Sequence, residues 1–385
     1  MNPCFSKFIL RCMCLPLILT VLFAPLFGSF RPSFGLEYPS WNATNIALVE
    51  ITPHDCDFIV LESWKGNLKP GEHVSVPQLI PGPQAVPIAL YAKQNRPFQP
   101  SKDYVEAVPR QAVGSRMVLF LQRARQGKGT PTASDSATAE WQPTDLFRDI
   151  RTSVIWLDAN QLYVFTQRTN PGPSVLSRWD SSLTAVHGKV VEIIGTQKAL
   201  DVIMRLREKS QRAQRLKPYV HSDVLPAKRF ALEELGKCGP SAMETILAML
   251  DDEDYKLDAE DLIKVYAEAG GESAGKELNN RLQKELKFWE TTGPTLQQGW
   301  WNQDAKPDAP LRLRYGQTIQ LVRGLHRTHY TPALTTAVQL RDFWRSYPQL
   351  NDPSGLDQLP RECNSLVNHL RKVTSKHREA ALSAW

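Results

Sequence analysis

The sequence lacks the two glycine-rich patterns that most readily indicate phosphate binding. It contains neither a G-x-x-x-x-G-K-[ST] loop nor a G-x-G-x-x-G turn after a strand, so no nucleotide cofactor is predicted. The chain also has only a small excess of positive charge, because its 385 residues include 46 Lys and Arg and 40 Asp and Glu. A nucleic-acid-binding protein typically has a larger and more clustered basic excess. We therefore expect no nucleic-acid partner.

Cysteine is too sparse to build a scaffold. Six cysteines are present, and three of them lie within the first 14 residues. The other three, Cys56, Cys238 and Cys363, match neither a zinc-ligand spacing nor a disulfide framework. Cys238 and Cys363 could pair in an oxidising compartment, but isolated buried thiols are the preferred interpretation. With 42% hydrophobic and 22% charged residues, the composition also excludes a collagen, a coiled-coil rod and a wholly disordered chain.

Residues 1–35 are predicted to be an export signal. Lys7 and Arg11 precede the apolar run 15–27, and small residues at 33 and 35 suit cleavage after Gly35. An uncleaved membrane anchor is the alternative, because residues 12–30 contain no charge. We expect an exported protein that is periplasmic, secreted or anchored to a bacterial cell envelope. Contact with the membrane would then occur only through this segment, if it stays uncleaved.

The first predicted domain, residues 36–195, has the features of β structure. Apolar and β-branched residues gather in short runs that are separated by turn-forming residues. Within residues 127–140 no apolar side chain is larger than Ala, which predicts an exposed, mobile loop. The predicted strands are 46–51, 57–64, 73–76, 115–122, 153–157 and 161–166, with a last strand at 189–194.

Part of this domain resembles a known family. Phe58 and Val60, the Trp64-Lys65-Gly66 motif and the later run 116–121 follow the order found in netrin-like or tissue-inhibitor-of-metalloproteinases-like domains. The resemblance covers about residues 46–122 and implies an OB-type β-barrel; a β-sandwich is the alternative. It does not carry over metalloprotease inhibition, because those inhibitors need an N-terminal cysteine and none lies near position 36.

The second predicted domain, residues 196–385, has helical periodicity. Leu200, Ile203 and Leu206 recur at helical spacing. The remaining surface carries basic residues between Arg205 and Arg215. That basic stripe could contact an acidic partner or a membrane, but a solvated helix face is the preferred interpretation.

Within this domain, residues 226–253 resemble a HEAT repeat. The pattern A-L-x-x-L-G, a turn around Gly239-Pro240, and L-x-x-L-D-D at 247–252 describe two helices joined by a short connection. Weaker copies occur at 262–289 and 318–344, and 359–373 adds one more helix. Because single hairpins of this kind cannot bury their apolar faces alone, the resemblance implies a short, degenerate α-solenoid over about 226–373.

Few residues have the types and spacing of a reactive centre. His326 and His329 could share a helix face and bind a metal, but no third ligand can be assigned and two ordinary histidines are preferred. Cys238 precedes a helix, where a thiol pKa can be lowered, yet no partner histidine is recognisable. The acidic run 251–254 lacks the spacing of a calcium loop. Trp289, Trp300, Trp301 and Trp344 are expected to pack in the core rather than to bind sugar or peptide.

The sequence therefore predicts an α+β protein of two domains, exported, without a cofactor and not an enzyme. Its expected function is protein binding or scaffolding through a helical face or a strand edge. One alternative is a hydrolase or metal-dependent enzyme that uses Cys238 or the pair His326 and His329. The other alternative is a protease inhibitor built on the β domain.

Overall fold

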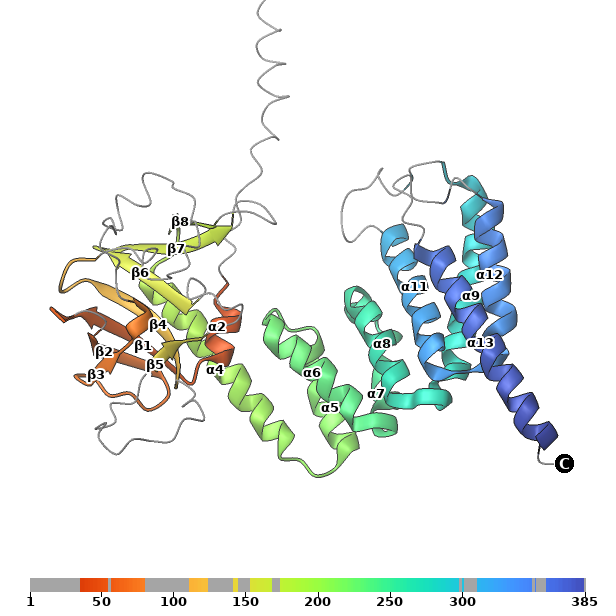
Figure 1. The fold of residues 1–385 in the computed structure, drawn as a ribbon, viewed down its shortest axis with the longest axis horizontal. Helices are drawn as coiled ribbons and strands as arrows, with labels where there is room; N and C mark the ends of the chain where they lie inside the picture. The colour runs from red at the N-terminus through yellow and green to blue at the C-terminus, as the bar shows by residue number, and fades with distance from the viewer. Residues whose placement is uncertain are drawn as a thin grey trace, which may run out of the picture. The chain divides into compact units, whose positions relative to one another are not determined.

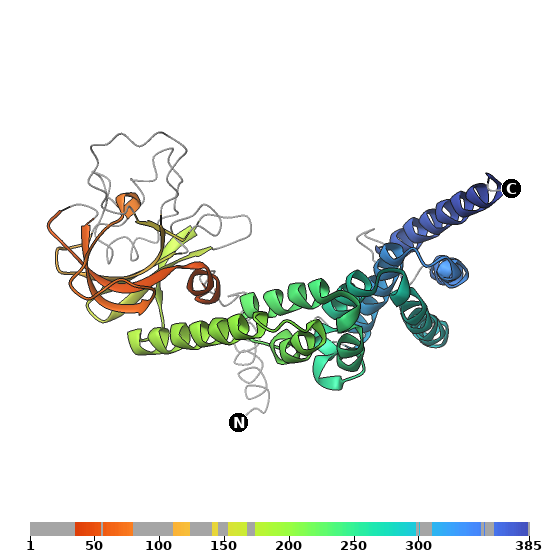
Figure 2. The same cartoon turned by 90° about the horizontal axis from the view of Figure 1, so that it is seen from below.

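The computed structural model describes residues 35–54, 57–79, 111–123, 141–144, 153–167, 174–297, 300, 310–347, 350 and 358–383. All of the predicted export signal except Gly35, and the predicted loop 127–140, lie outside these residues. The chain divides into two compact units, Met1–Ile194 and Gly195–Trp385, drawn in Figures 1 and 2. In the described parts of the chain, no helix has both the length and the apolar character needed to cross a membrane.

The first unit contains one antiparallel sheet. Its strands follow the order β3-β2-β1-β4-β6-β7-β8, and β5 pairs with β4 next to β6. A short helix, α2 (Glu37–Asn42), precedes them. The strands are β1 (Asn45–Ile51), β2 (Asp57–Lys65), β3 (His73–Ser75), β4 (Arg116–Arg123), β5 (Trp141–Pro143), β6 (Val154–Asp158), β7 (Gln161–Gln167) and β8 (Ser174–Trp179).

The sheet is open, which corrects the expected barrel. Barrel closure requires hydrogen bonds between the first and last strands of the path. Among the described residues, β3 and β8 stand at the two ends and do not pair with each other. Alternation along a strand reveals which side chains are buried but not whether the sheet closes, so the sequence pattern could not distinguish these architectures.

Both faces of the sheet are covered by apolar side chains. Alternate residues such as Val49, Val60 and Leu119 belong to one buried cluster. Val118 and Phe120 of β4 point to the opposite face and are also fully buried. Figure 2 shows the first part of α4 (Leu183–Met204) running along one face of the sheet. The ring of His187 in α4 lies 4.7 Å from the ring of Trp64 in β2.

The start of α4 corrects the predicted last strand. Residues 189–194 are helical, so helical structure begins at Leu183 rather than near Thr196. Valine and isoleucine favour strands locally. Here Val186, Val190 and Ile193 recur at helical spacing and are buried, so packing overrides that preference. Strand β8 was not predicted.

The second unit is helical throughout the residues that the structure describes. Helix α4 ends at Met204 and α5 begins at Lys209, so the predicted basic stripe is not one continuous helix face. The helices after α4 are α5 (Lys209–Val220), α6 (Leu225–Cys238), α7 (Met243–Leu250), α8 (Ala259–Gly270), α9 (Gly275–Thr292), α11 (Pro310–Thr328), α12 (Leu334–Ser346) and α13 (Gln358–Ser383).

These helices form consecutive hairpins, visible in Figure 1. Helices α6, α8, α11 and α13 contact one another in that order, and α9 contacts α12. The hairpins α6–α7, α8–α9 and α11–α12 share one type of turn. Gly239, Gly271 and His329 have positive φ angles of 64°, 50° and 55°. Gly239 and Gly271 each begin a 3₁₀ turn, and His329 lies two residues before a third one. Each of these turns ends in a fully buried alanine, and those alanines are Ala242, Ala274 and Ala333.

An aromatic cluster joins the last hairpins. Trp289 and Trp344 are almost completely buried, with ring centres 5.2 Å apart, and Trp300 lies 5.9 Å from Trp289. The indole nitrogen of Trp289 donates to Thr318 Oγ1 at 3.0 Å. The preferred interpretation of these residues as core is therefore supported, and Trp301 lies outside the described residues.

Candidate functional site

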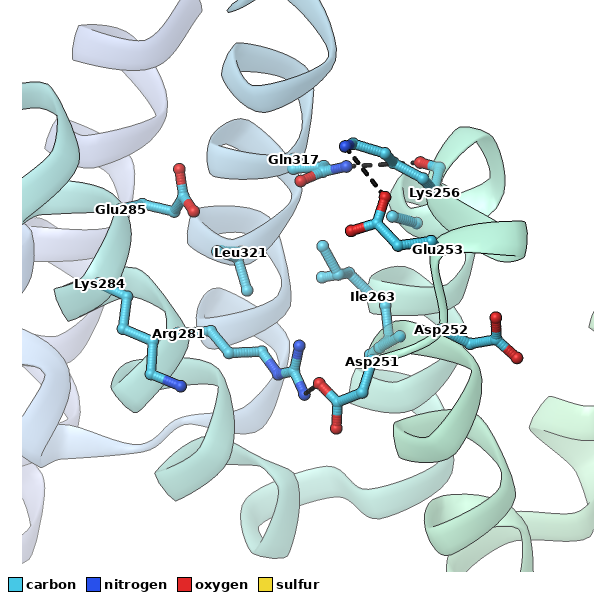
Figure 3. Close-up of a pocket in the computed structure, with 12 residues that line it drawn as sticks. Asp251, Asp252, Glu253, Lys256, Ile263, Arg281, Lys284, Glu285, Gln317 and Leu321 are labelled. Carbon is cyan, nitrogen blue, oxygen red and sulfur yellow. Dashed lines mark hydrogen bonds and ion pairs between the residues drawn. The ribbon is translucent and has the colours of Figure 1, made fainter. Parts of the chain in front are cut away.

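A polar groove with an apolar floor lies in the helical unit (Figure 3). We call it the helical groove; its volume is about 220 Å³. Helices α7, α8, α9 and α11 and the 3₁₀ turn Glu253–Asp258 surround it. Its lining residues are Leu250, Asp251, Asp252, Glu253, Lys256, Ala259, Ile263, Arg281, Lys284, Glu285, Gln317 and Leu321.

One wall of the helical groove is acidic. It is formed by Asp251, Asp252 and Glu253, where α7 ends and the next 3₁₀ turn begins. Asp252 starts that turn because its carboxylate accepts from the Asp254 backbone N–H at 3.1 Å. The side chains of Asp251 and Glu253 remain 68% and 87% exposed, so both are accessible to a partner.

The opposite wall comes from α9 and is basic. Arg281 Nη2 donates to Asp251 at 2.7 Å, and its Nε donates to Glu277 at 2.9 Å. Its side chain is only 20% exposed, so Arg281 is a fixed bridge between α9 and the end of α7. Lys284, one turn further along α9, has no ion pair or hydrogen bond with a described residue. It is therefore a cation available to a ligand.

Side chains of α11 complete the groove. Ile263 of α8 and Leu321 of α11 are buried and form its floor. The Gln317 side-chain amide donates to the Lys256 carbonyl at 3.4 Å. Arg314 makes a bidentate contact with Glu285 at 2.7 and 3.1 Å, which ties α11 to α9. The groove therefore offers an apolar surface between opposite charges, an arrangement suited to a short polypeptide segment.

A second cavity of about 550 Å³ lies between α6 and α8. Its lining includes Leu225, Arg229, Leu232 and Glu268. Only two helices border it, whereas four helices and a 3₁₀ turn supply the residues that line the helical groove. The helical groove is therefore the stronger candidate for recognition.

The fold places a third histidine beside the predicted pair. His329 Nδ1 lies 2.6 Å from His369 Nε2 of α13, and the rings of His326 and His369 stack at 4.1 Å. His369 is 40 residues from His329, so no local spacing could reveal it. Among the described residues, no group of three His, Cys, Asp or Glu side chains is arranged to hold a metal ion.

The structure disfavours Cys238 as a nucleophile. Cys238 and Cys363 are free and buried, so they do not pair with each other. Burial raises the pKa of the Cys238 thiol, although nearby Arg212 acts in the opposite direction. A cysteine nucleophile requires the thiolate, which a raised pKa makes scarce at neutral pH.

The sequence contains one catalytic-type motif that was not among the sites predicted above. Residues 271–275, GESAG, match the G-x-S-x-G spacing of a hydrolase nucleophile elbow. That elbow requires a strand-to-helix turn, whereas these residues join two helices, α8 and α9. The Ser273 hydroxyl donates to the Gly270 carbonyl at 2.6 Å. The match therefore reflects the repeated helical turn.

Comparison with protein-family models, with curated proteins and with solved structures finds no significant match to this chain.

Proposed function

We propose that this chain is a non-catalytic, exported protein-binding protein whose helical groove contacts the partner. The groove itself supports this function most strongly, because successive hairpins supply an apolar floor between an acidic and a basic wall. Stacked helical hairpins characteristically present extended surfaces for recognition. The partner would insert an apolar side chain above Ile263 and Leu321 and place charged groups beside it.

The repeated turn supports assigning the helical unit to a short, degenerate HEAT-like solenoid. Three hairpins share a positive-φ residue, a 3₁₀ turn and a buried alanine. Such units bury their apolar faces against their neighbours, as α8 does against α6 and α11. The open sheet removes the main structural reason for a netrin-like assignment, and no observation favours the protease-inhibitor alternative.

Site-specific photocrosslinking in the exporting host tests the binding role. A photoreactive residue at Gln317 reports on the helical groove. The control is the same residue at Glu290, an exposed site about two and a half turns beyond Arg281, on the opposite side of α9. We expect one defined adduct from position 317 and none from 290. Lys284→Glu should abolish the adduct, because it reverses the available positive charge.

The captured protein is then purified and titrated against the full chain and the Lys284→Glu variant. Saturable binding that the substitution weakens would support the proposal. Equal adducts from positions 317 and 290, or unchanged affinity in the variant, would refute the assignment of the groove. N-terminal sequencing of the mature chain separately tests the proposed export and cleavage after Gly35.

A further inference from the structure

We propose that His326, His329 and His369 form a proton-sensitive junction that holds helix α13 against α11 at neutral pH and weakens that contact in mild acid. We call these three residues the histidine junction. It lies where α11 ends and the turn into α12 begins, so it joins the last hairpin to the last helix. The proposal is independent of what binds in the helical groove.

The geometry limits how many protons the histidine junction can hold. A hydrogen bond between His329 Nδ1 and His369 Nε2, 2.6 Å apart, needs one nitrogen with a proton and one without. Protonating both rings removes the acceptor and breaks this bond. The His326 ring stacks on His369 at 4.1 Å and the His329 ring lies 4.8 Å away, so added positive charges also repel one another.

The surroundings of His369 also oppose its protonation. Burial lowers the pKa of His369, and the positive charges of His326, His329 and Lys372 lower it further. His326 belongs to α11, His329 to the following turn, and Lys372 lies one turn further along α13. None of these neighbours is a carboxylate that could stabilise the imidazolium.

Other charged side chains near this contact are already engaged. Arg323 of α11 forms an ion pair at 2.8 Å with Glu362, which lies in α13 nearly two turns before His369. Arg327, next to His326, pairs with Glu268 of α8 at 3.4 Å. Helix α12 contributes two arginines. Arg345 donates to Asn364 of α13 at 3.1 Å, and Arg341 pairs with Asp342 of its own helix at 2.7 Å. The 3₁₀ turn Thr331–Ala333 carries no charge.

The direction of the pH effect follows from proton linkage. A histidine whose pKa is lowered in the packed state binds protons more readily once α13 separates. Acid therefore favours separation, and the stabilisation present above the ordinary histidine pKa of 6.5 is lost as the pH falls. Leu366, Val367 and Leu370, which flank His369 and are buried, would become accessible to solvent.

Hydrogen exchange with mass spectrometry on the full chain tests the junction. We expect the protection of residues 358–383, corrected for intrinsic exchange, to fall about tenfold per unit of pKa depression between about pH 7.5 and pH 5. His369→Gln retains hydrogen-bonding capacity without titrating, so its protection should not depend on pH. His73→Gln removes an exposed histidine of the sheet and serves as the matched control. Identical pH dependence in wild type and His369→Gln would overturn the proposal.

A second measurement does not depend on the folding of any variant. NMR titration of the wild-type histidines should show coupled protonation, with at least one ring titrating clearly below pH 6.5. Independent titration of every histidine at or above about pH 6.5 would refute the junction. A Zn²⁺-induced rise in melting temperature that His369→Gln abolishes would instead reassign these residues to metal binding.

Discussion

Replacing Gly275 with alanine distinguishes helix propensity from tertiary packing. Gly275 is the first residue of α9, and alanine is the better helix former by about 1 kcal/mol. In the structure, however, the added Cβ would lie 2.3 Å from Tyr330 Cβ and 2.5 Å from its Cγ. Carbon atoms in good contact are about 3.5–4.0 Å apart, so one of the two segments must move.

The balance of these effects gives the expected magnitude. Forcing an extra carbon into a packed contact costs about 1–3 kcal/mol. Tyr330 cannot move away easily, because its Cβ is fixed to the turn between His329, with its positive φ, and Pro332. Setting this cost against a propensity gain of about 1 kcal/mol predicts a net loss of up to about 2 kcal/mol for Gly275→Ala.

Urea denaturation followed by far-ultraviolet circular dichroism measures this change. Gly188 and Gly195 in α4 are the controls, because no atom lies within 4 Å of a Cβ added at either position. We expect each control substitution to stabilise the chain by about 0.5–1 kcal/mol. If Gly275→Ala also stabilised the chain, close packing of α9 on the Tyr330 turn would be refuted.

Two further predictions follow from buried ionisable groups. Cys238 and Cys363 should resist iodoacetamide in the native chain, because burial raises the pKa of both thiols, that of Cys363 to about 12. Peptide mapping that finds either residue labelled without denaturant would contradict this prediction. Burial raises the pKa of Glu260, so its charged form opposes folding at neutral pH, and Glu260→Gln should increase the unfolding free energy there. That gain should shrink as the pH falls through the raised pKa of Glu260 and should be absent below the ordinary value of 4.5; a gain measured by urea denaturation that persisted in acid would exclude this cause.

The sequence predicted most local elements well. Strands β1, β2, β4, β6 and β7 begin and end within two residues of their predicted bounds, because short apolar and β-branched runs bounded by turn-forming residues are a local signal of strands. The hairpin α6–α7 was also anticipated, since Gly239 permits the positive φ and Pro240 suits the start of the next helical segment. Such signals come from neighbouring residues, so they can be recognised without the fold.

Two elements of the first unit show where local signals mislead. Residues 189–194 favour a strand by composition, but packing of Val190 and Ile193 makes them helical. The predicted strands suit a barrel, a sandwich or an open sheet equally well, and only the pairing order reveals the open sheet. In both cases the decisive contact lies outside the window of residues that sets local propensity.

The candidate sites show most clearly which information came from the sequence and which came from the tertiary structure. By itself, the sequence identified His326, His329, Cys238 and the acidic run 251–254 as chemically notable residues. Only the tertiary structure placed His369 against the histidine pair and set Arg281 opposite Asp251 across the helical groove. The reason is physical. A side chain's chemical type is encoded at its own position, whereas its neighbours and exposure depend on contacts between segments distant in the chain.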